Sequence, residues 1–148
     1  IRLDWLDAFS FNGVSFTPYG SLTYAHARMD GYVETGGSFP ASFDSTSDHS
    51  TVARLGLDTV HELTPDIRLL GRAEAAYRFE NDTAGPSGEI LGLSGFSLAG
   101  QDVDQFWLRG SVGAEFDIAG GTASVNLNLT SQGDDPSLWI NTGWKVAF

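Results

Sequence analysis

The stretch that decides the fold is Ile67–Phe79, which reads IRLLGRAEAAYRF. Its odd positions carry only uncharged residues, whereas four of its six even positions are arginine or glutamate. Successive side chains of a strand point to opposite faces of a sheet, so this period of two indicates one apolar and one polar face. Phe106–Ile118 alternates in the same way with the opposite parity. The chain is therefore predicted to be all-β.

The alternation extends outward from these two stretches. It continues cleanly in residues 122–130 and 137–148, and more loosely in Ile1–Phe11, Val14–Tyr32 and Thr51–Leu63. Soluble strands usually have about five or six residues, whereas a tilted strand that crosses a bilayer needs about 9–11. Several of the seven predicted strands reach the longer range. This length favours strands that span a membrane.

The connections between the strands alternate in length. The predicted tight turns are Asn12-Gly13, Thr64–Asp66 and Ala119–Gly121, and the long polar segments between them are Val33–Ser50, Glu80–Gln105 and Ser131–Pro136. Outer-membrane barrels have short periplasmic turns and longer extracellular loops. We therefore predict an antiparallel up-and-down transmembrane β-barrel, integral to the outer membrane of a Gram-negative cell.

Seven strands are an odd number, whereas bacterial single-chain barrels have even numbers and cannot leave an open edge in lipid. Residues 1–148 are accordingly interpreted as the C-terminal portion of one larger barrel domain. Glu89–Leu98 is placed in an external loop with local hairpin structure. If Ile90–Leu98 instead crosses the membrane, the chain is a small eight-stranded structural or adhesive barrel. The remaining alternative is a soluble all-β binding module, a β-sandwich.

The composition excludes several classes of function. The chain has 19 acidic residues against 8 Lys and Arg, a net charge of −11, which argues against nucleic acid as a partner. It has no cysteine, and His26, His49 and His61 lie too far apart for a metal-binding motif. We find no nucleophile elbow, phosphate loop or dinucleotide fingerprint. We expect no catalytic residue, no metal and no cofactor.

The polar positions of the strands are assigned to the barrel lumen, because an arginine such as Arg72 costs a few kcal/mol against lipid at the midplane. The predicted lumen-lining charged residues are Arg54, Asp58, Arg68, Arg72, Glu74, Arg78, Arg109, Glu115, Asp117 and Lys145. They either hold a linker segment in the pore or only pair with one another; the sequence does not distinguish these roles. The predicted lipid-facing aromatics are Tyr77, Phe79, Phe106, Phe116 and Trp144.

The acidic excess lies mainly in the predicted loops. The carboxylates there are Asp44, Asp48, Glu80, Asp82, Glu89, Asp102, Asp104, Asp134 and Asp135. We interpret these loops as solvated. The alternative is that divalent cations bridge the carboxylates to lipopolysaccharide.

The last eight residues, NTGWKVAF, resemble the C-terminal assembly signal of outer-membrane proteins. Asn141, Gly143, Val146 and Phe148 match its polar, glycine, hydrophobic and terminal aromatic positions. The resemblance implies that the barrel assembly machinery recognises this segment, and an extended terminal strand is suited to pairing with an exposed sheet edge.

A second resemblance covers the chain more widely. Residues 17–24 (TPYGSLTY), 29–37 (MDGYVETGG) and 96–100 (FSLAG) are similar to segments of the autotransporter β-domain. The resemblance implies a translocator barrel of twelve strands that anchors in the outer membrane and helps to export its own N-terminal passenger, by type V secretion. The implied partners are outer-membrane lipids and lipopolysaccharide, the assembly machinery, and the passenger or its linker. An enzymatic activity, such as that of an esterase passenger, would lie outside these residues.

Overall fold

The computed structural model describes residues 1–146, in which the regular structure consists of β-strands in two sheets. The chain divides into two compact units. Unit 1 comprises Ile1–Leu22, Ala53–Tyr77 and Phe106–Phe148, and unit 2 comprises Thr23–Val52 and Arg78–Gln105. The part of the chain that the structure describes has no helix long and apolar enough to cross a membrane.

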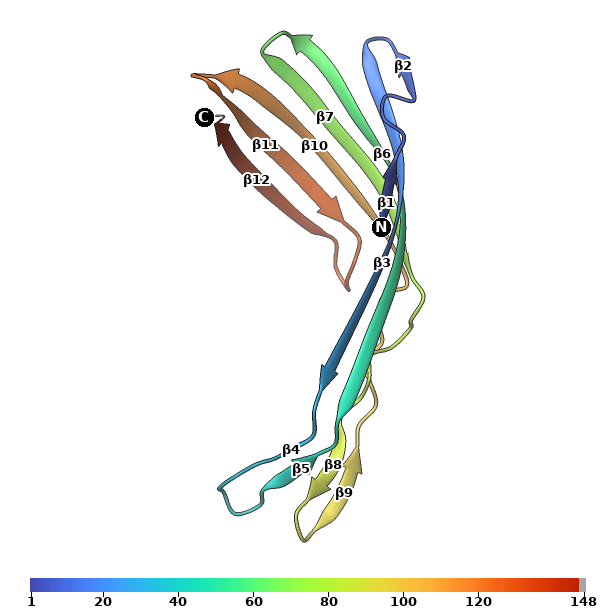
Figure 1. The fold of residues 1–148 in the computed structure, drawn as a ribbon, viewed down its shortest axis with the longest axis vertical. Coiled ribbons are helices and arrows are strands. Elements are labelled where there is room, and N and C mark those ends of the chain that lie inside the picture. Colours follow the sequence, from blue (N-terminus) through green and yellow to red (C-terminus); the bar gives the residue numbers. More distant parts are fainter. Residues whose placement is uncertain (147–148) are drawn as a thin grey trace. The chain divides into compact units, whose positions relative to one another are not determined.

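The larger sheet is an antiparallel meander. Its strands are β1 (Arg2–Asp4), β2 (Phe9–Phe11), β3 (Val14–Met29), β6 (Thr46–Thr64), β7 (Ile67–Arg78), β10 (Phe106–Ile118), β11 (Gly121–Thr130) and β12 (Ser137–Val146). Their order is β1-β3-β6-β7-β10-β11-β12, with β2 also paired to β3 (Figure 1). Neighbours in this order follow one another along the chain, except that β2 intervenes between β1 and β3, and the short strands of the other sheet, β4, β5, β8 and β9, intervene between later strands. The predicted all-β, up-and-down architecture is therefore confirmed.

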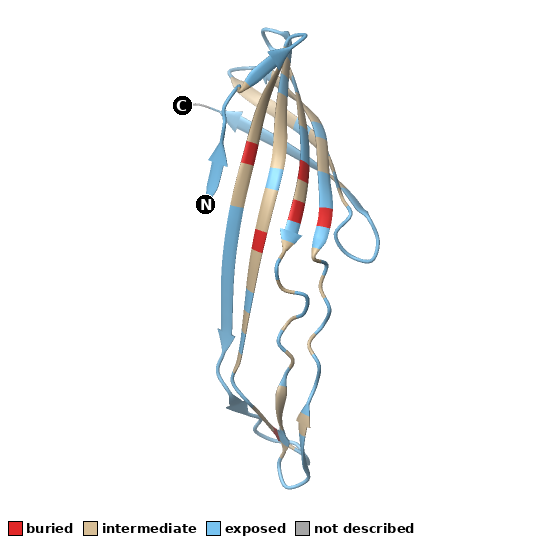
Figure 2. Cartoon of the chain, turned by 90° about the vertical axis from the view of Figure 1, so that its right-hand side faces the viewer, coloured by how far each residue is buried: buried red, intermediate tan, exposed pale blue. Residues whose placement is uncertain are grey.

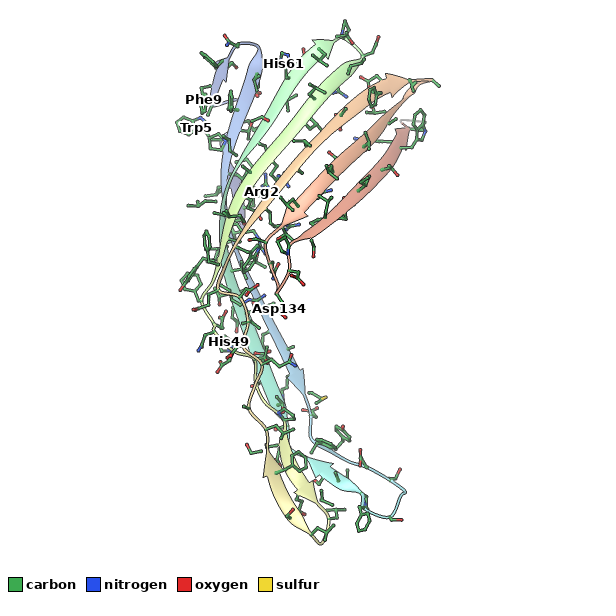
Figure 3. The ribbon with its side chains drawn as sticks, turned by 180° about the vertical axis from the view of Figure 1, so that it is seen from behind. Arg2, Trp5, Phe9, His49, His61 and Asp134 are labelled. Atoms are coloured by element: carbon green, nitrogen blue, oxygen red, sulfur yellow. The ribbon has the colours of Figure 1, made fainter. Side chains whose placement is uncertain are left out.

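The first predicted strand, Ile1–Phe11, is broken in two. β1 pairs Asp4 with Tyr19 and β2 pairs Phe9 with Phe16, so four residues of the first segment face two residues of β3. One of those two is Pro18, which has no N–H to give to the ladder but accepts a bond from the Trp5 N–H at 2.9 Å. The missing donor accounts for an extended bulge opposite the proline. Figure 3 shows Trp5 and Phe9 at this N-terminal edge.

The tight turns agree closely with their predicted positions. Asn12 and Gly13 both have positive φ, 49° and 77°, as a type I′ hairpin turn requires. The third turn is one residue shorter than predicted, because Gly121 already pairs with Ile118 in the β10–β11 ladder. The second turn likewise reduces to Pro65-Asp66, since β6 runs through Thr64.

The smaller sheet lies in unit 2 and is built from two long connections. Its order is β4 (Tyr32–Val33), β5 (Ala41–Phe43), β8 (Ser87–Ile90) and β9 (Ser94–Ser97). β8 and β9 form the local hairpin expected within Glu89–Leu98, but the hairpin adds to this second sheet. The alternative prediction, in which Ile90–Leu98 crosses the membrane as an eighth strand, is therefore wrong. The predicted boundaries of two long strands also shift: β3 ends at Met29, and β6 already begins at Thr46.

Burial in the larger sheet is confined to a few positions. In unit 1 the buried residues are Tyr19 on β3, Glu74 and Ala76 on β7, and Trp107 on β10 (Figure 2). Many large apolar side chains are instead exposed, among them Leu55 at 72%, Val112 at 63% and Ile140 at 66%. A soluble sandwich has the reverse arrangement, because its large apolar residues fill the core.

Candidate functional site

The register of the sheet brings charged side chains of neighbouring strands onto one face, which we name the polar face. On β7 and β10, Glu74 pairs with Arg109, Arg72 with Ser111, and Arg68 with Glu115. The opposite, apolar face carries the alternate residues. Opposite charges placed directly across two strands stabilise their pairing. The parity read from Ile67–Phe79 thus places acidic and basic residues side by side across the β7–β10 ladder.

Glu74 is the most buried acid of the polar face, with 9% of its surface exposed. Its Oε2 accepts a hydrogen bond of 2.6 Å from the Tyr19 hydroxyl. Its Oε1 stands 3.7 Å from Nε of Arg54 and 3.9 Å from Nη1 of Arg109. A carboxylate withdrawn from water needs such partners, because an unpaired buried charge is strongly unfavourable. Glu74 therefore ties together β3, β6, β7 and β10.

Asp58 is the second carboxylate of the polar face that binds two cationic side chains. Arg72 donates to both of its carboxylate oxygens, and Arg2 Nη2 donates to Oδ2 at 3.0 Å. Arg2 also pairs with Asp4 at 2.6 Å, and its guanidinium lies 3.7 Å from the centroid of the Tyr19 ring. The bidentate pair between Arg72 and Asp58, and the contact of the Arg2 guanidinium with the Tyr19 ring, restrict the conformations of these side chains.

Sequence reasoning missed Arg2, Asp4 and Tyr19 as members of this network. A signal for the first two was present, since they alternate with Ile1 and Leu3 as the charged residues of β7 alternate with apolar ones. The break between β1 and β2 obscured the parity of that strand. Nothing in its neighbouring sequence distinguishes Tyr19 from a tyrosine predicted to face lipid, such as Tyr77.

A third cluster lies near the turn that joins β10 and β11. Arg68 stands 3.2 Å from Glu115 and 3.3 Å from Asp117, and the Thr122 hydroxyl donates to Asp117 at 2.6 Å. The ion pairs of the polar face thus include eight of the ten charged residues assigned to the lumen: Arg54, Asp58, Arg68, Arg72, Glu74, Arg109, Glu115 and Asp117.

The other two predicted lumen residues have different surroundings. Lys145 is exposed on β12, opposite Thr122. Arg78 is the last residue of β7 and belongs to unit 2, where its N–H donates to the Gln105 carbonyl at 2.7 Å. The wall of paired charges therefore covers the unit 1 part of the sheet.

Amide side chains continue the polar face onto β11 and β12. Asn128 Nδ2 donates to Asn141 Oδ1 at 2.6 Å. A hollow of about 370 Å³ adjoins them, and its polar lining comes from Asp58, Thr59, Arg72, Ser111, Asn126, Asn128 and Asn141. This surface offers hydrogen-bond donors and acceptors to water or to a polypeptide. Among the described residues no group of three or more His, Asp or Glu is arranged to hold a metal ion.

The residues matched to the assembly signal lie on the last strand. Asn141 and Gly143 face the polar side, opposite Asn126 and Ser124, and Val146 ends β12 on the apolar side. The expected terminal aromatic, Phe148, lies outside the described residues. Its role in assembly stays a prediction.

Four of the five aromatics assigned to the lipid lie on the apolar face. Phe106 and Trp144 are 60% and 53% exposed, and Tyr77 is 42% exposed opposite Phe106. Phe116 is half-buried opposite Ile67. Phe79 follows the end of β7 and belongs to unit 2, where its N–H donates to the Thr51 carbonyl at 3.0 Å.

Comparison with known proteins gives the family. Residues 7–130 match the model of the autotransporter beta-domain, which is most of the chain. The chain belongs to this family of outer-membrane translocator β-barrels of type V secretion, and the predicted resemblance is confirmed. No curated protein matches the sequence.

In unit 2, the carboxylate of Glu80 accepts a hydrogen bond from the backbone. Glu80 Oε2 accepts the Thr51 N–H at 2.8 Å, and the His49 ring, labelled in Figure 3, stands 3.8 Å from Oε1. The backbone hydrogen bond from Thr51 is the main cause that lowers the pKa of Glu80 below its usual 4.5. A carboxyl group whose pKa is lowered by folding stabilises the folded state at a pH above its unfolded-state pKa. That stabilisation is lost as the pH falls through the folded-state pKa.

We therefore expect acidification below pH 4.5 to release the bond between Glu80 and the Thr51 amide. In ¹⁵N-labelled protein in micelles, the Thr51 amide resonance is expected to titrate with a midpoint below that pH. Glu80→Gln is the matched control, because it keeps an acceptor oxygen but does not titrate in this range. A midpoint at or above 4.5 in the wild type, or the same titration in the Gln variant, would contradict the assignment.

Proposed function

We propose that this chain is part of an outer-membrane barrel that anchors its polypeptide in a Gram-negative outer membrane and helps to export an N-terminal passenger of the same polypeptide. The partners proposed with it are outer-membrane lipids and lipopolysaccharide, the barrel assembly machinery, and the passenger or its linker. The excess of 19 acidic over 8 basic residues argues against nucleic acid.

The observation that carries the proposal is the division of one sheet into two unlike faces. One face holds eight charged side chains in ion pairs across β6, β7 and β10. The other leaves leucines, valines and isoleucines exposed, which is unfavourable in water but suits contact with lipid hydrocarbon. A sheet with these two faces can separate a water-filled lumen from a bilayer.

Closure of the barrel belongs to the same proposal. β1 and β12 end the strand order of the sheet, and their outward N–H and C=O groups need partners if they lie in lipid. We propose that the natural polypeptide supplies further strands between them, so that residues 1–148 form the C-terminal portion of one domain. The polar face then lines a pore through which a linker can pass.

The proposal predicts that Phe148 is needed for efficient assembly. When the natural polypeptide is expressed in a Gram-negative host, we expect a heat-modifiable barrel in the outer membrane and an upstream part that added protease removes from intact cells. Deletion of Phe148 should reduce both signals several-fold without lowering synthesis or passage into the periplasm. Phe148→Tyr keeps an aromatic terminus and should retain them.

Two outcomes would count against the proposal. An inserted barrel whose upstream part stays protected from external protease would favour a structural or adhesive barrel. Equal insertion with and without Phe148 would remove the assigned assembly signal, while leaving the translocator role to be judged by the protease result. We assign no catalytic residue to this proposed function.

A further inference from the structure

The four-stranded sheet of unit 2 ends in a strand, β9, whose outer edge pairs with no other strand of residues 1–146 (Figure 1). The Leu98 N–H donates to the Pro86 carbonyl at 3.0 Å, and β9 pairs with β8 from Ser94 to Ser97. Backbone groups of alternate residues point to opposite sides of an antiparallel strand. The N–H and C=O groups of Gly95 and Ser97 therefore point away from β8, toward the outside of the sheet.

This edge differs from the edge at the other end of the sheet. β4 has only two residues and is flanked by Asp30 and Glu34. β9 has four residues, SGFS, without charge or proline. Short strands, charges and prolines are the usual features that prevent a further strand from pairing with an edge. β9 is thus the less protected edge, and its length limits a docked strand to a short segment.

One face of the same sheet carries a row of aromatic rings that ends at β9. Tyr32 stacks on Phe43 with centroids 4.9 Å apart, and Phe43 meets Phe96 edge to face at 5.5 Å. Gly88 lies between Phe43 and Phe96 in register, and a Cβ there would meet the Ser42 carbonyl oxygen and the Phe96 ring. The glycine therefore allows the two rings to meet across β8. A strand added at β9 would place an apolar side chain beside Phe96 and extend the row.

The charge of unit 2 favours a basic partner. Its two segments carry nine acidic residues and two arginines, which gives a net charge of −7 out of −11 for the whole chain. The charged residues are Arg28, Asp30, Glu34, Asp44 and Asp48 in the first segment, and Arg78, Glu80, Asp82, Glu89, Asp102 and Asp104 in the second. A partner with Lys or Arg at its ends would be attracted to this unit and oriented by it.

We propose that β9 binds an extended segment of the exported polypeptide by strand addition. The segment has alternating apolar residues, one of which packs beside Phe96, and basic residues at its ends. Gly95 and Ser97 supply the backbone hydrogen bonds, as in other cases of strand addition. This inference rests on the proposed function, because it assumes that unit 2 lies on the extracellular side where the passenger emerges.

The first test is a peptide titration of the full chain in detergent micelles. The probe is a fluorescein-labelled peptide, KKVTVTVKK, and the control peptide is KKPTPTPKK, which cannot pair as a strand. We expect the first to bind, and hydrogen exchange to slow at the Gly95 and Ser97 amides. The Leu98 amide, already bonded to Pro86, should change little. No binding, or protection spread away from β9, would overturn the proposal.

A pair of variants at Gly95 sharpens the test. Gly95→Pro removes an outward N–H and no bond to β8, whereas Gly95→Ala keeps the N–H, and its Cβ comes no closer than 3.6 Å to the Gly88 carbonyl oxygen. We expect the proline variant to bind the probe roughly five- to tenfold more weakly, as loss of one hydrogen bond implies, and the alanine variant to bind normally. Equal binding by both variants would overturn the proposal. Unchanged protection of the Leu98 amide verifies that the hairpin survives.

The second test identifies the occupant in cells. A photo-reactive amino acid in place of Ser97 of the natural polypeptide is expected to cross-link to the upstream part of the same polypeptide during export. A cross-link to a second copy, or none, would overturn the passenger as occupant. Failure of the proposed function would appear separately, as loss of outer-membrane insertion or of surface exposure, neither of which the peptide titration requires.

Discussion

Replacing Ala73 with arginine is expected to prevent stable insertion of the barrel. Ala73 lies at the middle of β7 on the apolar face, exposed and opposite Gly110. An arginine facing lipid near the bilayer midplane costs about 2–4 kcal/mol, which corresponds to roughly a 30- to 900-fold change in the insertion equilibrium. Outer-membrane fractionation and heat-modifiability on gels would measure the loss. Ala73→Leu adds bulk without charge and should insert normally.

The neighbouring position provides the opposite test. Arg72 lies on the polar face, where it pairs with Asp58. Arg72→Leu should insert as the wild type does, because it takes a charge from the lumen side and adds none to the lipid side. Asp58 keeps a second partner, since Arg2 Nη2 stands 3.0 Å from it. If Ala73→Arg and Arg72→Leu impaired insertion equally, the assignment of the two faces would be wrong.

The alternation of polar and apolar residues predicted the strands whose own sequence shows which residues lie on each face. Arg68, Arg72 and Glu74 mark the polar face of β7 so clearly that the parity needs no partner strand. The same holds for β10, where Arg109 and Glu115 share a face. Because adjacent strands pair residue by residue, two correct parities also predict that these charges meet. The ion pair between Arg68 and Glu115 is such a case.

Features that depend on two distant segments were beyond prediction. The two-residue strand β4 and the three-residue strand β5 come from one connection, and β5 pairs with the hairpin of another. Segments so short have no measurable period. The break after Asp4 was missed for a related reason. Trp5 and Leu6 look like strand residues, and the cause of the break, Pro18, lies on the partner strand.

The contact between Tyr19 and Gly56 is of this second kind, and it leads to the other large prediction. A Cβ at Gly56 would fall on the Cζ, Oη and Cε1 atoms of the Tyr19 ring, so the absence of a side chain on β6 is what admits the ring. Gly56→Ala must therefore displace Tyr19. Overpacking of this kind costs about 1–3 kcal/mol. Displacement also removes the hydroxyl from Glu74, and a buried acceptor without its donor costs about another 1–3 kcal/mol.

We accordingly expect Gly56→Ala to lower the free energy of unfolding by several kcal/mol in a denaturant titration of the refolded protein. Gly110→Ala is the matched control, because its Cβ would come no closer than 3.7 Å to the Arg72 carbonyl oxygen. If Tyr19 is the obstacle, adding Tyr19→Ala to Gly56→Ala should cost less than the two single changes together, which a double-mutant cycle measures. Additive effects, or equal stability of the Gly56 and Gly110 variants, would show that the ring does not depend on the glycine. A favourable coupling would establish that the Tyr19 ring packs against β6 because residue 56 has no side chain.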